Sequence, residues 1–250
     1  MNKFIPNIYR LEIDITYLCT LKCFNCNRGI SVAPHNREHN MTVDQIQKFI
    51  EQSLEAKHPW ERIKLIGGEP TIHPQFDEIL ELLHSYKIEH NINLDLRVTS
   101  NGTTKYTQQK LDEINQSYPD VIVENSGKVD NFIPGFALSH VAPCDMYAYK
   151  NHNYKGCWIP EECGIGLNFS GFYPCSIGGS IARIFDLDFA IKNVKDINIE
   201  ILMGMYNSLC SLCGMYHNIK VDDENIETIM SPTWQKRIDS IDNRYILSKF

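Results

Sequence analysis

The chain has 250 residues, of which 43% are hydrophobic, and its formal net charge is −7. This length suits one large α/β domain, alone or with a small appendage, and the composition is that of a folding chain. The acidic balance without a long basic run argues against nucleic acid as a partner. No apolar run is long enough to span a membrane, and Met1 to Arg10 lacks a signal-peptide pattern, so we expect a cytoplasmic protein with no membrane partner.

Strand and helix patterns alternate through the first half of the chain. Apolar and polar residues alternate in the expected strands, whereas apolar residues recur every three to four positions in the expected helices. The predicted elements in chain order are a strand at 11–16, a helix at 42–57, a strand at 62–66, a helix at 76–86, a strand at 94–99, a helix at 107–117 and a strand at 121–124. Repeated strand–helix units indicate a parallel sheet, with the functional loops at the carboxyl ends of its strands.

The alternation of strand and helix patterns ends at about residue 130. Residues 131–160 are rich in proline, glycine, histidine and aromatic residues, and they show little periodicity. Segments 165–169 and 172–174 flank Ser170-Gly171, which predicts a β-hairpin, and 231–242 predicts a final helix. We expect two units, 1–150 and 151–250, with the boundary near residue 150.

Three unusual loops follow the first three predicted strands. They contain the first cysteines, the Gly67-Gly68-Glu69-Pro70 turn and the Ser100-Asn101-Gly102 turn. Because the carboxyl ends of parallel strands share one edge, all three loops are expected on one rim. Adjacent glycines would let the backbone approach a ligand closely there.

The chain contains nine cysteines. Disulfides are rare in a reducing compartment, so metal ligation is the stronger explanation. Cys19, Cys23 and Cys26 form a C-x3-C-x2-C motif directly after the first strand. Thiolates suit iron–sulfur clusters and zinc, and three of them on a four-iron cluster would leave one iron open. The alternative is a zinc knuckle with His35 or His39 as the fourth ligand.

These motifs, in this order, resemble the radical S-adenosylmethionine (SAM) superfamily over roughly residues 8–126. The resemblance implies a partial TIM-like (β/α) barrel and a 4Fe–4S cluster whose open iron binds SAM. It implies that Gly67, Gly68, Glu69 and Pro70 form the turn at the methionyl amino group, and that Ser100 and Asn101 lie near the ribose or carboxylate. Reduction would then release a 5′-deoxyadenosyl radical that abstracts hydrogen from a substrate.

One position departs from this family. Its members usually carry an aromatic residue before the third cysteine, near the adenine, whereas this chain has Asn25 there and Phe24 one position earlier. No clear match to the family's later adenine-contacting motif occurs.

A second group of cysteines lies in the C-terminal part. On spacing alone, Cys210 and Cys213, a CxxC pair, together with Cys175 at the end of the predicted hairpin, favour a zinc ribbon. This part also resembles the Twitch and SPASM extensions of radical SAM enzymes, which implies a small hairpin-and-helix domain with one auxiliary 4Fe–4S cluster. Five cysteines compete for its four ligand positions, and either Cys157 or Cys163 would join the other three.

Polar residues on the first and third strands are expected to face the barrel interior. Glu12, Asp14 and Thr16 alternate with apolar residues, and 95, 97 and 99 repeat the pattern. They would line a polar substrate chamber or form a buried ion-pair network. Cys144 is a candidate hydrogen donor, with a plain buried cysteine as the alternative. Tyr147, Tyr149 and His152 are further candidates, which could equally pack a loop.

The leading hypothesis is a radical SAM oxidoreductase or isomerase that dehydrogenates or epimerises a small molecule, such as a sugar or cyclitol. The auxiliary cluster would accept an electron, and the resemblance implies a flavodoxin or ferredoxin as electron donor. One alternative is a peptide- or protein-modifying maturase, although no leader-binding module is visible. A more distant alternative is a non-catalytic zinc-binding adaptor.

Overall fold

A mixed sheet forms the centre of the protein. The computed structural model describes residues 5–33, 39–128, 137–146, 157–217, 228–241 and 250. Within these residues, six strands pair in the order β4-β3-β2-β1-β5-β6. Neighbouring strands from β4 to β5 are parallel, and β6 is antiparallel to β5. The strands are β1 (Arg10–Thr16), β2 (Arg62–Gly67), β3 (Asp95–Ser100), β4 (Ile122–Asn125), β5 (Ile165–Asn168) and β6 (Gly171–Tyr173).

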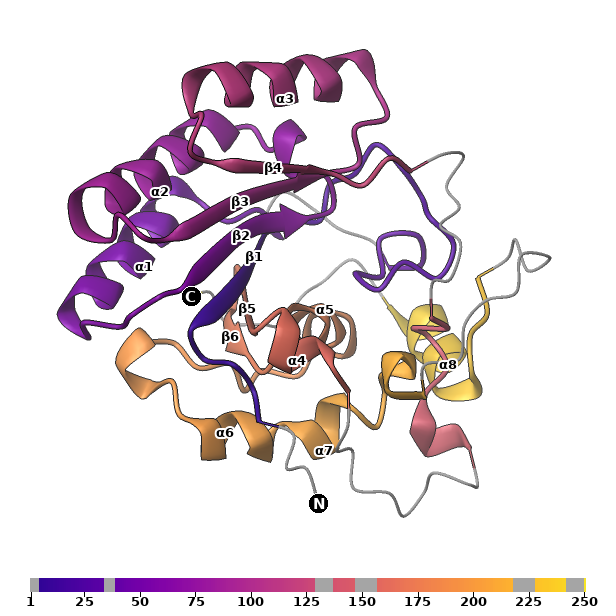
Figure 1. The fold of residues 1–250 in the computed structure, drawn as a ribbon. Helices are drawn as coiled ribbons and strands as arrows, with labels where there is room; N and C mark the ends of the chain where they lie inside the picture. The colour runs from indigo at the N-terminus through magenta and orange to yellow at the C-terminus, as the bar shows by residue number, and fades with distance from the viewer. Residues whose placement is uncertain (1–4, 34–38, 129–136, 147–156, 218–227, 242–249) are drawn as a thin grey trace.

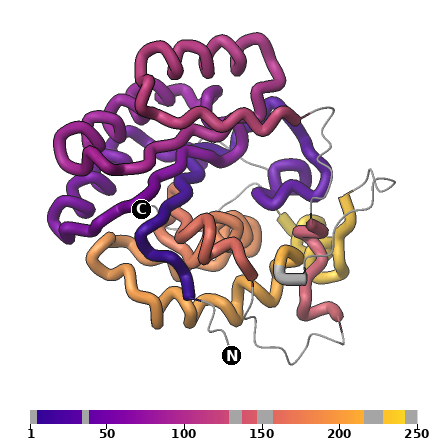
Figure 2. Tube along the Cα trace, in the orientation of Figure 1, coloured from indigo at the N-terminus to yellow at the C-terminus, as the bar shows by residue number. Residues whose placement is uncertain are grey.

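Helices from the two halves of the chain lie on opposite sides of β1. The crossover helices α1 (Val43–Glu55), α2 (Phe76–His90) and α3 (Lys105–Ser117) cover the outer side of β1 to β4 (Figure 1). The orange segment with α6 (Ile199–Gly204) and α7 (Tyr206–Leu209) lies on the other side (Figure 2). The other helices are α4 (Ile159–Glu162), α5 (Ser176–Phe185) and α8 (Pro232–Ser240), with short 3-10 turns η2 (Pro70–Ile72), η3 (Pro143–Asp145), η5 (Val194–Asp196) and η6 (Gly214–His217).

Strand β1 is buried on both faces. Leu11, Ile13 and Ile15 are fully buried and belong to one hydrophobic core with the apolar faces of α1 and α2. Glu12 and Asp14 point the other way and are also buried, at 5% and 1% exposure. Burying an apolar row stabilises the sheet, but burying carboxylates requires partners for their charge.

The crossover helices start where the sequence supplies capping residues. The Thr42 hydroxyl accepts a hydrogen bond from the Gln45 N–H, and the Gln45 side-chain oxygen accepts one from the Thr42 N–H, which closes a capping box before α1. Thr104 and Thr107 form the same arrangement before α3. Such reciprocal bonds satisfy N–H groups that a helix start leaves unpaired.

The predicted α/β fold is confirmed, with parallel strand–helix units consistent with a partial TIM-like barrel. The four predicted strands and three crossover helices of the first half are present within a few residues of their expected bounds, and the hairpin and final helix are present as well. The hairpin was expected in a separate C-terminal unit, but β5 pairs directly with β1, from Leu11 opposite Ile165 to Ile13 opposite Leu167. Strand β5 therefore extends the main sheet, and every one of its residues is buried. The division into units 1–150 and 151–250 stays a prediction.

Glycine permits this added pairing. Gly164 precedes β5 with φ +87°, and a Cβ placed there would lie 2.0 Å from the Arg10 carbonyl oxygen. A larger residue would therefore separate the two strands. Among the described helices, none has the length and apolarity needed to cross a membrane.

Candidate active site

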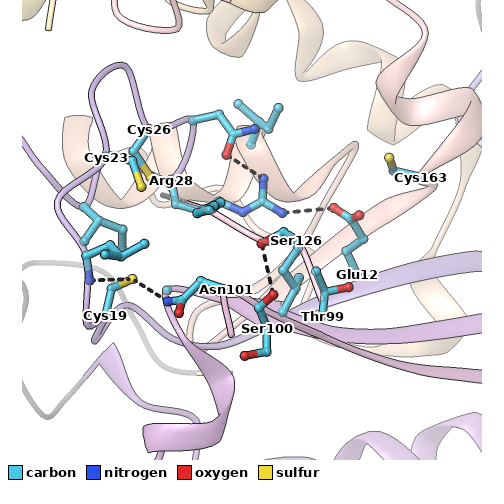
Figure 3. A pocket seen from close by; sticks show the side chains of 18 of the residues that line it. Glu12, Cys19, Cys23, Cys26, Arg28, Thr99, Ser100, Asn101, Ser126 and Cys163 are labelled. Atoms are coloured by element: carbon cyan, nitrogen blue, oxygen red, sulfur yellow. Dashed lines mark hydrogen bonds and ion pairs between the residues drawn. The ribbon is translucent and has the colours of Figure 1, made fainter. Parts of the chain in front are cut away.

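A cavity of about 240 Å³ lies at the carboxyl ends of β1, β2 and β3. The three loops that the sequence singled out meet at this cavity (Figure 3). The candidate residues that line it are Cys19, Cys23, Cys26, Gly67, Gly68, Ser100 and Asn101. The expectation that these loops share one rim is therefore confirmed.

Three thiols give this cavity a soft donor set. Cys23 is buried at 4% exposure, and Cys19 and Cys26 are partly buried. Burial raises the pKa of Cys19 to about 11, although a hydrogen bond from the Leu21 backbone opposes this. Burial also raises the pKa of Cys23. Metal binding would have to displace these protons, which couples loading of the site to pH.

The donor chemistry fits an iron–sulfur cluster with an open iron. Three thiolates beside an open cavity leave room for a fourth, non-protein ligand. In the described part of the chain, the three thiols line one cavity but are not grouped around a position for a single metal ion. His39 lies apart from this cavity, stacked on Phe169 at 5.0 Å, and His35 lies outside the described residues.

The Gly-Gly-Glu-Pro turn packs against the end of β1. Gly67 has φ +137°, and a Cβ there would lie 2.3 Å from the Thr16 carbonyl oxygen. A Cβ on Gly68 would lie 2.0 Å from the Leu18 carbonyl oxygen. The Gly68 and Glu69 N–H groups donate to the Thr16 and Leu18 carbonyls at 2.8 and 2.7 Å. The glycines therefore hold the turn against the segment that leads into the cysteine loop.

Glu69 is directed into the protein and does not line the cavity. Its side chain is fully buried, and one carboxylate oxygen accepts hydrogen bonds from the Thr71 N–H and hydroxyl at 3.2 and 2.7 Å. The other oxygen accepts from the Asn101 N–H at 2.7 Å. Pro70, which starts the 3-10 turn η2, is also buried outside the cavity lining. In this structure, Glu69 joins the two turns.

Asn101 connects the third loop to the first. Its side-chain amide donates to the Thr20 hydroxyl at 3.0 Å and lies 3.8 Å from the Cys19 sulfur. Hydrogen bonds to ligand sulfurs tune the reduction potential of an iron–sulfur cluster. Ser100 is buried, and its hydroxyl accepts from the Gly102 N–H at 3.1 Å.

A chain of alternating charges runs across the barrel interior. Its successive nitrogen–oxygen contacts are Asp95–Arg97 (2.6 Å), Arg97–Glu124 (2.7 Å), Glu124–Lys64 (3.0 Å), Lys64–Glu12 (3.9 Å), Glu12–Arg28 (3.0 Å) and Arg28–Asp14 (3.1 Å). Glu12, Lys64 and Arg97 are register neighbours on adjacent strands. Four acidic and three basic groups leave a net charge of −1. The expected ion-pair network is present; it is buried at Glu12, Arg28 and Asp14 and 27–29% exposed at Arg97, Asp95 and Glu124. Glu12, Arg28 and Thr99 also line the cavity.

Arg28 was missed by the sequence reasoning. Burial alone would lower the pKa of Arg28, but the nearby Asp14 and Glu12 raise it, so the guanidinium stays charged. Burial raises the pKa of Asp14, and attraction to Arg28 offsets only part of that effect. The available signal was the pair of inward carboxylates on β1, because buried carboxylates need a cationic partner.

Asn25 has a structural role in place of the aromatic residue usual in the family. It is buried with φ +52°, a left-handed conformation that asparagine tolerates better than most residues. Its side-chain oxygen accepts from the Ile229 N–H at 3.1 Å, and its own N–H donates to the Thr228 hydroxyl at 3.3 Å. Asn25 thus ties the cysteine loop to a C-terminal segment.

The C-terminal cysteines separate into two places. Cys157, Cys175, Cys210 and Cys213 line a second, mostly apolar cavity of about 20 Å³. Cys163 lines the first cavity instead, beside Glu12 and away from Cys23 and Cys26 (Figure 3). Burial and the neighbouring thiols raise the pKa of both Cys175 and Cys210 well above the ordinary value.

Cys144 is not brought to either cavity. It lies in η3, and its sulfur is 3.8 Å from the Thr233 hydroxyl. A hydrogen donor must reach the substrate, so the expected role of Cys144 finds no support in this geometry. Tyr147, Tyr149 and His152 lie outside the described residues.

Most of the residues that line the first cavity fall in a part of the chain that matches a known protein family. Residues 13–123 match the model of the Radical SAM superfamily. A probable GTP 3′,8-cyclase of Pyrococcus abyssi (strain GE5 / Orsay) is 30% identical over 123 residues, which cover 47% of this chain and 37% of that protein. One of Methanococcus maripaludis (strain C7 / ATCC BAA-1331) is 34% identical over 124 residues, which cover 46% and 38%.

The match spans well under half the length of these relatives. Among solved structures, the crystal structure of BtrN in complex with AdoMet and 2-DOIA aligns with a TM-score of 0.47 and 13% identity, covering 90% of this chain and 96% of that one. Residues 13–123 thus match a Radical SAM domain, and this match together with the cyclase relatives indicates an enzyme.

Proposed function

We propose that this protein cleaves SAM reductively and uses the resulting radical to abstract hydrogen from a small polar molecule. Cys19, Cys23 and Cys26 would hold the 4Fe–4S cluster that, when bound, supplies the electron for this cleavage. The observation that carries the proposal is that these thiols, the Gly67-Gly68 turn and the charged side chains of Glu12 and Arg28 line one cavity. Cofactor and substrate could therefore lie within reach of each other.

The polar residues that line the cavity favour a polar substrate. Glu12, Arg28 and Thr99 offer hydrogen-bond acceptors and donors next to the cofactor loops. A sugar or cyclitol presents hydroxyl groups that match such partners, and we propose dehydrogenation or epimerisation as the outcome. The charged side chains that line the cavity are Glu12, Arg28 and Lys128. GTP, which the relatives' name gives as their substrate, is therefore included in the test below.

The second cavity supports an auxiliary 4Fe–4S cluster. We assign Cys157, Cys175, Cys210 and Cys213 as its ligands, because these four thiols surround one apolar space while Cys163 does not. In a dehydrogenation, the substrate radical would release a proton to solvent and pass one electron to this cluster. A flavodoxin or ferredoxin would supply the electron for SAM cleavage.

Product analysis in deuterated buffer tests the proposed reaction. The protein, reconstituted anaerobically with iron and sulfide, would be incubated with SAM, dithionite and separate panels of sugars, cyclitols, GTP and peptides. A polyol that accelerates SAM cleavage and appears either two mass units lighter or with one new deuterium supports the proposal. Acceleration by peptides alone would favour a maturase, and bound zinc without iron would favour the adaptor.

A further inference from the structure

The side chain of Arg28 connects three parts of the molecule beside the first cysteine cluster. Arg28 follows Cys26 by two residues and is 5% exposed. Its Nε donates to Asp14 at 3.1 Å, and its Nη2 donates to Glu12 at 3.0 Å. The same Nη2 donates to the Ser176 hydroxyl at 2.8 Å. The guanidinium thus joins the cysteine loop to β1 and to the first residue of α5.

The backbone of Arg28 is held by the other end of the same helix. Its carbonyl oxygen accepts a hydrogen bond from Nη2 of Arg183 at 3.1 Å. Arg183 is fully buried, and its guanidinium lies 4.2 Å from the centre of the Tyr17 ring. Helix α5 therefore contacts Arg28 through residues in both its first and last turns.

The next residue gives independent evidence that the loop is fitted to α5. Gly29 has φ +65°, and a Cβ there would lie 2.3 Å from Cδ1 of Ile184 on α5. The Gly29 N–H donates to the Cys26 carbonyl at 2.7 Å, which closes a tight turn. A larger residue at position 29 would adopt a strained φ and would displace the end of the Ile184 side chain.

We propose that Arg28 and Ser176 are positioning residues that hold Cys26 in the position needed to bind the cluster. Because Ser176 lies in the C-terminal half of the chain, that half then helps to form the SAM-binding cluster site. The proposal rests on the proposed function of the first cavity. Ser176 directly follows Cys175, which lines the second cavity, so one hydrogen bond links the segments that carry the two sets of cysteines. An arginine is required because its planar fork reaches two carboxylates and a hydroxyl at once, which a lysine ammonium cannot do in the same geometry.

A merely structural role makes a different prediction. If Arg28 only neutralised Asp14 and Glu12, a lysine would lower stability but leave the cluster and SAM binding intact. If Arg28 positions Cys26, a lysine would also alter the environment of the cluster and weaken SAM binding. Ser176→Ala separates the two roles further, because it removes the hydrogen bonds that the Ser176 hydroxyl makes with Arg28 and Glu12. Every charge and the bond from Arg183 to the Arg28 carbonyl stay in place.

The test compares Arg28→Lys and Ser176→Ala with matched controls in the reconstituted protein. Arg237→Lys changes a half-buried arginine that pairs with Asp186 at the far end of α5, and Ser53→Ala changes a buried serine on α1. Neither control residue lines the first cavity. The readouts are the electron paramagnetic resonance signal of the reduced cluster with and without SAM, the SAM dissociation constant and the thermal midpoint.

We expect both test variants to change the SAM-dependent signal and to weaken SAM binding by about tenfold, or ~1.4 kcal/mol. The controls should bind SAM like the wild type even where they lower the thermal midpoint. If Arg28→Lys does not fold, Ser176→Ala alone decides. A Ser176→Ala variant with the SAM affinity and the paramagnetic resonance signal of the wild type would overturn this proposal but leave the proposed function standing. A wild type without a cluster or SAM binding would overturn the proposed function as well.

Discussion

The carboxylate of Glu69 accepts a hydrogen bond from the backbone N–H of Asn101 at 2.7 Å, with both residues buried. This bond joins the turn after β2 to the turn after β3. Since the Asn101 side chain reaches Thr20 in the cysteine loop, all three loops of the cavity are linked. Glu69 therefore holds the shape of the site, whatever further contact it makes with a bound cofactor.

Replacing Glu69 tests this link. Glu69→Ala would leave the Asn101 N–H and both Thr71 donors without their acceptor, and each unpaired buried donor costs about 1–3 kcal/mol. Glu69→Gln keeps one carbonyl oxygen and so can serve only one of the two turns, which predicts an intermediate loss. Urea unfolding of the protein without cofactors measures both changes. Equal stability of Glu69→Ala and the wild type would contradict the role assigned here.

Two glycines form a matched pair. Gly68→Ala would place a Cβ 2.0 Å from the Leu18 carbonyl, whereas a Cβ on Gly204 at the end of α6 meets no atom within 4 Å. We expect Gly68→Ala to destabilise the fold by at least about 1–3 kcal/mol, as overpacking does. Gly204→Ala should be neutral or stabilising by up to about 1 kcal/mol. Thermal unfolding of both variants provides the comparison, and a harmless Gly68→Ala would mean that the turn can move away from β1.

The two candidate fourth ligands predict different iron contents. The wild type, with two loaded clusters, should bind about eight iron atoms per chain. Cys157→Ala should retain about four, because it removes a thiol from the second cavity. Cys163→Ala should retain the wild-type content, since that thiol lines the first cavity beside Glu12. Iron and sulfide analysis after anaerobic reconstitution decides the matter, and the reverse pattern would assign Cys163 to the cluster.

The interior charge chain predicts a dependence of stability on pH. Burial disfavours the charged form of Glu124, but hydrogen bonds from Arg97, Thr99 and Lys64 outweigh it and lower the pKa to about 2 from an ordinary value of 4.5. A carboxyl whose folded-state pKa is lowered contributes its full stabilisation above pH 4.5 and loses it as the pH falls towards 2. Glu124→Gln lacks this contribution at every pH.

The stability difference between wild type and Glu124→Gln should therefore be constant near neutral pH and shrink between pH 4.5 and 2. Urea titrations at several pH values measure it. Thr99→Ala removes one of the hydrogen bonds that favour the charged carboxylate, so it should move the loss towards higher pH. A difference that does not depend on pH would show that Glu124 keeps an ordinary pKa in the folded protein.

The rim of the cavity was predictable because its signals are local. Strands repeat every two residues and helices every three to four, so both can be recognised from neighbouring residues in the sequence. The parallel topology then places Cys19, Gly67 and Ser100 on one edge of the sheet. The alternation of Glu12 and Asp14 with apolar residues also predicted which face of β1 carries charge.

The contacts between distant segments could not be read in the same way. The pairing of β5 with β1 depends on a hairpin more than 140 residues away in the chain, and a short apolar strand does not specify its neighbour. Arg28 is one arginine among many until the fold places it against two carboxylates. The choice between Cys157 and Cys163 likewise depends on which way α4 and its flanking residues turn, which spacing does not encode.

Formation of 5′-deoxyadenosine reports directly whether the Cys19, Cys23 and Cys26 site supports reductive cleavage of SAM. The reconstituted wild type and a Cys19→Ala/Cys23→Ala/Cys26→Ala variant would be incubated with SAM and dithionite, with and without the polyol panel, and analysed by mass spectrometry. We expect 5′-deoxyadenosine from the wild type only, in amounts that rise with the substrate. A wild type that holds its cluster and binds SAM, yet forms no 5′-deoxyadenosine with any panel member, would contradict this expectation.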